Sequence, residues 1–272
     1  VHGGLLTETL PPAPNGVRPQ KRYSYGQVYA WVKNASGVLV QASSPIWLVT
    51  QISECRTTAS CVGTADETRT TFGYGAAGTV NAQRVMSKTV ASGDGTLSTT
   101  TAYTYDAIGN KLTEDGPLVG TADTTRWRYD VMRRVVGVIS PDPDASGPRK
   151  LRAVRNSYDA IGRLVKVETG TVNSLSDADW AAFVALQSED TEFDLLDHKV
   201  KVTRKGGGTT FAVTQMSYDA AGRLQCTAVR MDPAQWATQT DACTPQLTGP
   251  NGPDRVTKLV YNAASEVIKT QQ

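Results

Sequence analysis

The sequence lacks the long apolar run that a membrane span needs. No stretch of 18 apolar residues occurs among its 272 residues. It also lacks a signal peptide, because it begins Val1-His2-Gly3-Gly4, without a charged or an apolar leader region and without an initiator methionine. We therefore expect the chain to be a piece or a processed product of a longer protein, in which case the missing leader says nothing about export.

Histidine is scarce, which limits nucleophilic catalysis because the usual base in such reactions is a histidine. Only His2 and His198 are present; His2 lies at the terminus, and His198 falls within one copy of a repeated phrase. The loop from Lys205 to Thr210 is glycine-rich but lacks the Gly-Lys-Ser/Thr ending of a phosphate-binding loop. The acidic loops lack the spacing of a calcium loop. The sequence therefore predicts no enzyme, no cofactor and no metal site.

A strong net charge is also missing. Lysine and arginine total 28 against 26 acidic residues, and the two signs are interspersed, so there is no basic patch for nucleic acid. Hydrophobic residues make up 39%, somewhat below the usual globular share, whereas threonine, serine, glycine and alanine are plentiful. This composition suits strands with a polar face, where cross-strand pairs contribute much of the stability.

What the sequence does contain is a repeated phrase. Tyr158-Asp159-Ala160-Ile161-Gly162-Arg163-Leu164 recurs as Tyr105 to Lys111 and as Tyr218 to Leu224, with the aromatic, the acid and the glycine in register. Looser copies begin at Tyr74, Tyr129, Phe193 and Tyr261, and Tyr25 is a candidate for a further, worn copy. Recurrence with the aromatic in the same place indicates a repeat protein.

Each copy predicts a tight turn. The aspartate can accept hydrogen bonds from backbone N–H groups two residues on, and the glycine supplies the positive φ that closes the bend. A basic residue and a β-branched alternation follow, as in Arg163 to Thr169, so a hairpin with about three to five loop residues fits. The residues assigned to these turns are Tyr105, Asp106, Gly109, Tyr129, Asp130, Tyr158, Asp159, Gly162, Arg163, Phe193, Asp194, Tyr218, Asp219, Gly222, Arg223 and Tyr261.

Short stretches of strand character, separated by Gly, Pro and Asp, continue along the chain. The sequence therefore predicts an all-β fold, an antiparallel meander of hairpins whose edges must close or be capped. Residues 1–22 are Pro-rich and are expected to be a linker or an edge segment, and residues 23–272 are expected to form one repeat region. The most apolar strand, Ile46 to Ile52, is expected in the core.

Two inserts break this pattern toward helix. Ser176 to Leu186 has an N-cap serine, acids in the first turn and apolar residues at helical spacing, which predicts about three turns. Pro233 to Gln239 predicts about one or two turns around Trp236. In each insert the tryptophan is expected to anchor the segment on the sheet; sugar binding by an exposed ring is the alternative.

The four cysteines form two close pairs in the sequence. Cys55 lies near Cys61, and Cys226 lies near Cys243, which predicts two local disulfides, each stapling a loop to its own hairpin. Buried free thiols are the alternative. A metal site fits less well, because the CxxC spacing and a nearby histidine are missing. If the disulfides form, the protein belongs in an oxidising compartment.

The Tyr-Asp phrase resembles the YD repeats of the bacterial RHS family, which is related to the extracellular repeat region of animal teneurins. The resemblance covers roughly residues 74–272. It implies a long β-sheet that spirals into a hollow shell, often around a toxic C-terminal domain or a secreted cargo. In that family a core motif with an autoproteolytic site commonly precedes the toxin, and no such segment is found before Gln272. Neither the protease nor the toxin is therefore carried over.

The function expected from these observations is a non-enzymatic structural scaffold, part of a secreted or cell-surface bacterial RHS shell with one or two short helical inserts. Its expected partner is an encapsulated or C-terminal polypeptide of the same longer chain, such as a toxin. Other copies of the chain, pairing at strand edges, and cell-surface glycans are further candidate partners, whereas nucleic acid and a membrane span are not expected. The alternative is an extracellular adhesin-like or self-assembling surface protein that contacts glycans or partner proteins.

Overall fold

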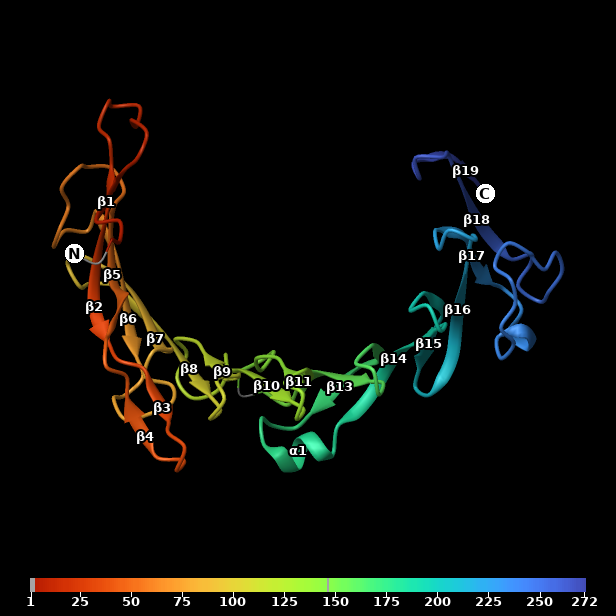
Figure 1. Cartoon of the computed structure of the whole chain (residues 1–272), viewed down its shortest axis with the longest axis horizontal. Helices are drawn as coiled ribbons and strands as arrows, with labels where there is room; N and C mark the ends of the chain where they lie inside the picture. Colours follow the sequence, from red (N-terminus) through yellow and green to blue (C-terminus); the bar gives the residue numbers. More distant parts are fainter. Residues whose placement is uncertain (1–2, 146) are drawn as a thin grey trace. The chain divides into compact units, whose positions relative to one another are not determined.

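The computed structural model describes residues 3–145 and 147–272. These residues form β-strands, one short α-helix and one 3-10 turn (Figure 1). They divide into two compact units. Unit 1 consists of Val1–Arg134 and Ser140–Arg149, and unit 2 consists of Val135–Ile139 and Lys150–Gln272. No helix in the described ranges is long and apolar enough to cross a membrane.

The main sheet of unit 1 is antiparallel, and its strands pair one after another from β1 to β10. In the order of their pairing they are β1 (Thr7–Thr9), β2 (Gln20–Val28), β5 (Ile46–Cys55), β6 (Glu67–Tyr74), β7 (Val85–Ser92), β8 (Ser98–Tyr105), β9 (Lys111–Asp115) and β10 (Thr125–Tyr129). A separate hairpin of β3 (Trp31–Lys33) and β4 (Leu39–Gln41) lies in the connection between β2 and β5. Because β1 pairs with β2, part of the first 22 residues lies at a sheet edge; the division of the chain after residue 22 stays a prediction.

Unit 2 is also an antiparallel meander, in which every strand pairs with its neighbour in sequence. Its strands are β11 (Val135–Ile139), β12 (Leu151–Tyr158), β13 (Leu164–Val172), β14 (Val184–Phe193), β15 (Lys199–Gly206), β16 (Thr209–Tyr218), β17 (Leu224–Arg230), β18 (Arg255–Tyr261) and β19 (Val267–Gln271). The predicted all-β meander of hairpins is therefore confirmed.

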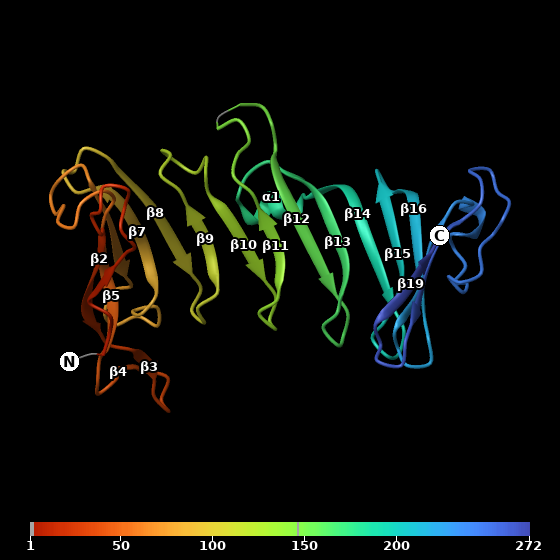
Figure 2. The ribbon, with the colours of Figure 1, turned by 90° about the horizontal axis from the view of Figure 1, so that it is seen from above.

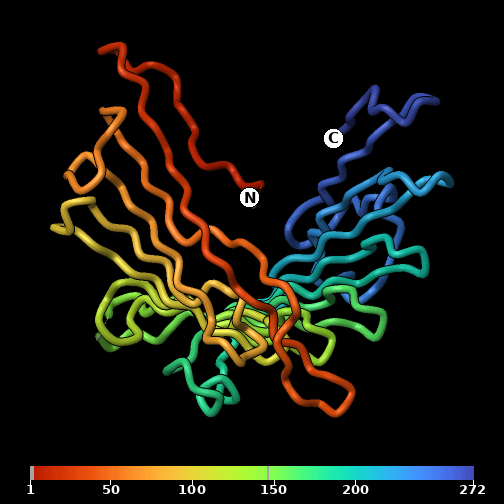
Figure 3. Tube along the Cα trace, turned by 60° about the vertical axis from the view of Figure 1, so that its left-hand side comes forward, coloured from red at the N-terminus to blue at the C-terminus, as the bar shows by residue number. Residues whose placement is uncertain are grey.

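The Tyr-Asp turns connect alternate pairs of strands, so in each unit they gather at one edge of the sheet. In unit 2 they join β12 to β13, β14 to β15, β16 to β17 and β18 to β19, along the lower edge in Figure 2. The connections at the opposite ends of the strands carry the inserts, including the long excursion between β17 and β18 that can be followed in Figure 3. The Tyr-Asp turns and the variable loops thus lie at opposite ends of the strands.

Buried apolar residues form two small clusters in unit 2. One consists of Ile139, Leu151, Ala153 and Val172, and the other contains Cys226, Ala228 and Ala242. The expectation that Ile46 to Ile52 is a core strand is wrong, since Ile46 is 46% and Trp47 43% exposed. The reason is the register: β6 pairs with β5 only from Gln51 onward, so the first half of β5 lacks that neighbour.

The first helical insert is shorter than predicted. Ser176 does cap the helix, accepting a hydrogen bond from the Asp179 N–H at 3.1 Å, but α1 spans only Asp177–Ala181. The expectation of three turns is wrong because the chain from Val184 onward pairs with β13, and this pairing outweighs helical spacing. The Trp180 ring packs against the first apolar cluster, as an anchor would.

The second insert, for which the sequence predicts about one or two turns over Pro233 to Gln239, contains one 3-10 turn, η1 (Pro233–Gln235). Asp232 caps this turn by accepting a hydrogen bond from the Ala234 N–H at 3.0 Å. The Trp236 indole N–H donates to the carbonyl oxygen of Arg230 at 2.9 Å, which ties the insert to the end of β17. Both tryptophans therefore anchor their inserts on the sheet.

Candidate functional site

The repeated phrase folds into the same hydrogen-bonded turn in its successive copies. In the best copy, Oδ1 of Asp159 accepts from the N–H groups of Ile161 at 3.1 Å and Arg163 at 2.9 Å. Its Oδ2 accepts from Nε of Arg163 at 2.7 Å. The same pattern recurs at Asp130 and Asp219. The carboxylate thus satisfies the backbone of its own bend, as the sequence predicted.

The fifth residue of each turn has a positive φ. In the close copies it is a glycine, with φ of 87° at Gly109, 96° at Gly162 and 75° at Gly222. The looser copy at Tyr74 also has a glycine, Gly78, with φ of 85°, whereas the other three place Arg133, Asp197 and Ser265 there, with φ of 64°, 65° and 63°. Since a residue with a Cβ is strained in this region, the glycine of the close copies is explained by the bend itself.

The sixth residue varies while the turn is preserved. His198 holds the place of the arginine and lies with Nδ1 3.0 Å from Oδ2 of Asp194. In the last copy the donor and the acceptor change places, because the amide of Asn262 donates to Oε2 of Glu266 at 2.8 Å. The two side chains can therefore exchange donor and acceptor roles as long as they remain a pair.

The tyrosine of each copy links its hairpin to the hairpin before it. The Tyr105 hydroxyl donates to the carbonyl oxygen of Val85 at 3.0 Å, and the Tyr218 hydroxyl to that of Lys199 at 2.9 Å. Each acceptor is the first residue of the strand that follows the preceding turn. The same bond joins Tyr129 to Lys111, Tyr158 to Val135 and Tyr261 to Leu224.

Sequence reasoning missed this role of the tyrosines, although their constancy was a signal. The turn needs only the acid and the positive-φ residue, so an aromatic that stays in place implies another task. A shift of the strand register also lies at Tyr74, Tyr105, Tyr158, Phe193, Tyr218 and Tyr261. Tyr25 shows the same shift and donates to the carbonyl of Leu5 at 2.9 Å, but β2 continues through Gly26 to Val28, so no turn of the repeat follows it.

The arginine of a turn reaches forward to the next turn. Nη1 of Arg163 donates to the carbonyl oxygen of Asp194 at 3.2 Å and to Oδ1 of Asp197 at 2.7 Å, and its guanidinium lies 4.7 Å from the centre of the Phe193 ring. Arg223 repeats this arrangement on the last turn, 4.6 Å from the ring centre of Tyr261. Tyrosine and arginine together link consecutive hairpins in both directions.

Electrostatics stabilise the ionised form of these aspartates. The Arg223 guanidinium, followed by the Arg223 backbone N–H, holds the pKa of Asp219 below its usual value. Burial raises the pKa of Asp159, but the hydrogen bonds and charge of Arg163 outweigh it and the net shift is downward. Burial raises the pKa of the Tyr129 hydroxyl above its usual value.

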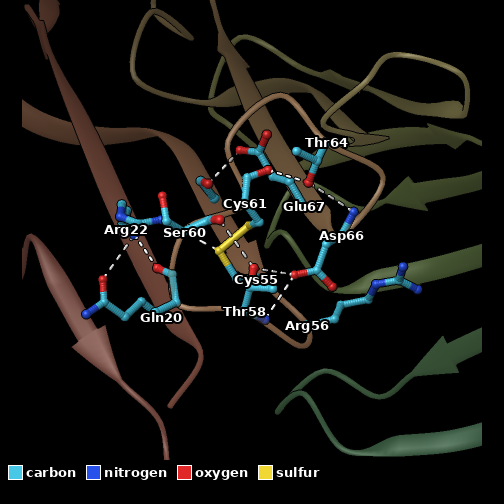
Figure 4. The surroundings of a disulfide bond; sticks show 12 residues. Gln20, Arg22, Cys55, Arg56, Thr58, Ser60, Cys61, Thr64, Asp66 and Glu67 are labelled. Carbon is cyan, nitrogen blue, oxygen red and sulfur yellow. Dashed lines mark hydrogen bonds between the residues drawn. A yellow bond between two sulfur atoms is a disulfide. The ribbon is translucent and has the colours of Figure 1, made fainter. Parts of the chain in front are cut away.

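Both predicted disulfides are present, Cys55–Cys61 in unit 1 and Cys226–Cys243 in unit 2, and the described residues hold no free cysteine. The first closes the connection between β5 and β6 (Figure 4). Arg22 of β2 holds this loop from the neighbouring strand, because its guanidinium donates to a loop carbonyl at 2.6 Å. The loop is therefore attached to the sheet by the disulfide to Cys55 of β5 and by the hydrogen bond from Arg22 of β2.

Two carboxylates, those of Asp66 and Glu67, accept hydrogen bonds that hold this loop (Figure 4). Asp66 accepts hydrogen bonds from the hydroxyl and N–H groups of Thr57 and Thr58, and these lower its pKa to about 2. Glu67 is 2% exposed and accepts from the Ser53 hydroxyl at 2.5 Å. Burial raises the pKa of Glu67, but its hydrogen bonds outweigh that effect and the net shift is downward. Both carboxylates thus hold loop structure.

The insert between β17 and β18 depends on a buried arginine. The side chains of Arg230 and Asp254 are 4% and 3% exposed and form an ion pair at 2.7 Å. Arg230 also donates to Oε1 of Gln215 at 2.8 Å and to carbonyl oxygens of the insert. Pairing and hydrogen bonding of this kind are what allow a charge to be buried. The arginine therefore docks the insert on β16 and β17.

An open hollow of about 660 Å³ lies beside two of the turns in unit 2, lined by Asp194, His198, Tyr218, Gln239 and Asp241 among others. The His198 ring stacks on Tyr218 with ring centres 4.3 Å apart while its Nδ1 pairs with Asp194. Within residues 3–145 and 147–272, no group of three His, Cys, Asp or Glu residues could hold a metal ion. Of the polar residues named, Asp194, His198 and Tyr218 belong to the turns, and Gln239 and Asp241 belong to the insert between β17 and β18.

No family model matches the chain, and no curated protein matches it. The solved structures that resemble it include crystal structures of TcdB2–TccC3, of TcdB2–TccC3–Cdc42 and of TcdB2–TccC3 without its hypervariable C-terminal region. Each aligns over 97% of this chain and 15% of its own, at 13–14% identity and a TM-score of 0.39. This chain thus spans less than a fifth of their length. A likeness at this level is distant and does not identify a family.

Proposed function

We propose that the chain is a non-enzymatic stretch of an RHS-type repeat sheet. Its role is to form part of the wall of a larger shell that encapsulates or presents a toxin or other polypeptide of the same longer chain. The observation that carries the proposal is the linkage of consecutive turns. Tyrosine hydroxyls reach back one hairpin and arginines reach forward one hairpin, as Tyr218 and Arg163 do.

This linkage suits a thin wall. The buried apolar clusters are small, and strands such as β8 alternate between exposed and half-buried residues. Polar pairs join the strands across the surface: the hydroxyls of Thr89 and Thr100 lie 2.8 Å apart, and those of Thr104 and Thr113 lie 2.6 Å apart. A single sheet with water on both faces needs such pairs and turn links in place of a thick core.

The proposed location is outside the cytoplasm, in secreted or cell-surface form on a bacterium. Its support is the pair of disulfides, since such bonds form and persist in oxidising compartments. The Cys55–Cys61 loop lies between β5 and β6, at the end of these strands away from the Tyr-Asp turns, whereas Cys226 lies in β17 only three residues after Arg223. The second disulfide thus ties the insert that follows β17 back to the part of β17 near a turn.

The test starts from the native protein purified from its source. The intact mass should be much greater than 29.1 kDa. Limited proteolysis should reveal an inner polypeptide that resists protease until the protein is denatured. A mature mass near 29.1 kDa would refute encapsulation, and glycan binding by a chain of that size would favour the adhesin-like alternative.

Variants of the native protein sharpen the test. Replacing Arg163 and Arg223 together by alanine removes two forward links and should speed cleavage of the enclosed polypeptide. Arg204→Ala is the matched control, because Arg204 lies on the same sheet but pairs with Glu189 on an exposed surface at 3.0 Å. Equal cleavage in the double variant and the control would contradict the role given to the links.

A further inference from the structure

The contact between consecutive turns involves two particular positions. We call the positive-φ residue of a turn its bend residue (Gly78, Gly109, Arg133, Gly162, Asp197, Gly222 and Ser265) and the residue just before the second strand its exit residue (Arg84, Asn110, Arg134, Arg163, His198, Arg223 and Glu266). In the pairs seen within each unit, the exit residue of one turn contacts the bend residue of the next.

These contacts are chemically complementary. The exit residue Arg163 meets a bend aspartate at 2.7 Å, and Arg223 meets the hydroxyl of Ser265 at 3.2 Å. Where the exit residue is Asn110, the roles are reversed: the bend residue Arg133 is the donor, and its Nε donates to Oδ1 of Asn110 at 3.0 Å. An arginine at the exit position is thus the donor to the bend residue, whereas Asn110 at that position is the acceptor.

A glycine at the bend makes room for a large exit side chain. The Arg84 guanidinium fills the space that a side chain at Gly109 would take, and a Cβ at Gly222 would lie 3.3 Å from Nε2 of His198. In both cases the exit residue also faces the aromatic of the next turn: Arg84 lies 5.5 Å from the Tyr105 ring centre, and His198 stacks on its neighbour. A cation or an aromatic ring can make this contact, but a carboxylate cannot, because the face of an aromatic ring is negative.

The last turn carries a carboxylate at the exit position. Glu266 is exposed and has one oxygen on the amide of Asn262. The strand that follows it, β19, pairs with β18 and ends the sequence of paired strands in unit 2. The exit group at this sheet edge is therefore an acceptor with a negative charge, unlike Arg163, His198 and Arg223 in the turns that precede it in unit 2.

We propose that the polypeptide that docks on β19 is a repeat hairpin with an arginine or lysine at its bend position. Charge complementarity carries this inference: an acceptor at the exit selects a donor at the bend, as Asn110 and Arg133 show within unit 1. The inference rests on the proposed function, because only a sheet that is part of a longer repeat array has such a neighbour.

The test appends one hairpin to the full chain after Gln272. The hairpin is a copy of residues 125–139, which carries a natural bend arginine at Arg133, joined through a short glycine linker. A second version has Arg133→Asp in the appended copy. A third moves the charge by one place, with Met132→Arg and Arg133→Gly, and serves as the matched control. Each version is made with Glu266 and with Glu266→Arg, and hydrogen exchange of β19 is measured.

With Glu266, the bend arginine should slow exchange of the β19 amides by about two- to fivefold relative to the bend aspartate and to the shifted arginine. With Glu266→Arg, the order of arginine and aspartate should reverse. If both hairpins protect β19 equally, the sheet extends but the charge inference is wrong. If no hairpin protects β19, the edge does not accept a repeat, and the proposed function fails together with the inference.

Discussion

Phe193 stands where the other copies of the repeat have a tyrosine that bonds to the preceding hairpin. In each other copy of unit 2, the acceptor is the first residue of the strand after the preceding turn. For position 193 that residue is Leu164, which begins β13 and is paired with Tyr158. Phe193→Tyr should therefore add one hydrogen bond, from the new hydroxyl to the Leu164 carbonyl oxygen.

The expected gain is modest. The existing tyrosine bonds measure 2.7–3.0 Å, so the geometry is good. A hydrogen bond of this kind contributes about 0.5–1.5 kcal/mol net to stability, and because Leu164 is 38% exposed the new bond replaces one to water. We expect about 0.5–1 kcal/mol, which corresponds to a rise in Tm of about 1–4 °C for a chain of this size.

Thermal and urea unfolding of the wild-type chain and of Phe193→Tyr would measure the gain. Phe211→Tyr is the control, because Phe211 is 55% exposed and lies away from the turns. Tyr218→Phe, which removes an existing bond, should lower stability by a similar amount. Phe193→Tyr with stability equal to or below that of the wild type would refute the account of the tyrosine links.

Three further perturbations test the turns and loops. Gly222→Ala forces a Cβ into a positive φ of 75° and should cost about 1–2 kcal/mol in chemical denaturation, whereas Gly206→Ala, at ordinary φ, should change stability little. Replacing Cys226 and Cys243 by alanine opens a loop of 17 residues and should cost about 3 kcal/mol; no change would mean the buried arginine alone holds the insert. Because the folded pKa of Asp66 is about 2, below its ordinary value, its contribution is complete above about pH 4 and lost as the pH falls toward 2; an NMR midpoint near 4 would contradict its threonine contacts.

Part of the site follows from contacts within a few residues, and this part could be predicted. The acid and the positive-φ residue of each turn act on a backbone two to four residues away, so the bend at Asp159 and Gly162 could be read from one copy of the phrase. Repetition then implied hairpins, and close spacing implied the two disulfides.

The links between hairpins could not be derived in this way. The acceptor of Tyr105 is 20 residues away in sequence, and that of Tyr261 is 37 residues away. Nothing in the phrase itself tells which carbonyl a hydroxyl will meet, since that depends on how the variable loop between two copies returns the chain. The register shifts at aromatics such as Tyr158 and Tyr218 are likewise a property of two paired strands.

The sequence by itself therefore determined the repeated turn, the β character of the strands and the cysteine pairs, because short-range sterics and hydrogen bonds decide them. The tertiary structure alone decided which residues join one hairpin to the next, why Ile46 and Trp47 are exposed, and why α1 ends at Ala181. Each of these depends on the strand that lies alongside. In a sheet built from hairpins, the neighbouring strand is brought there by residues tens of positions away.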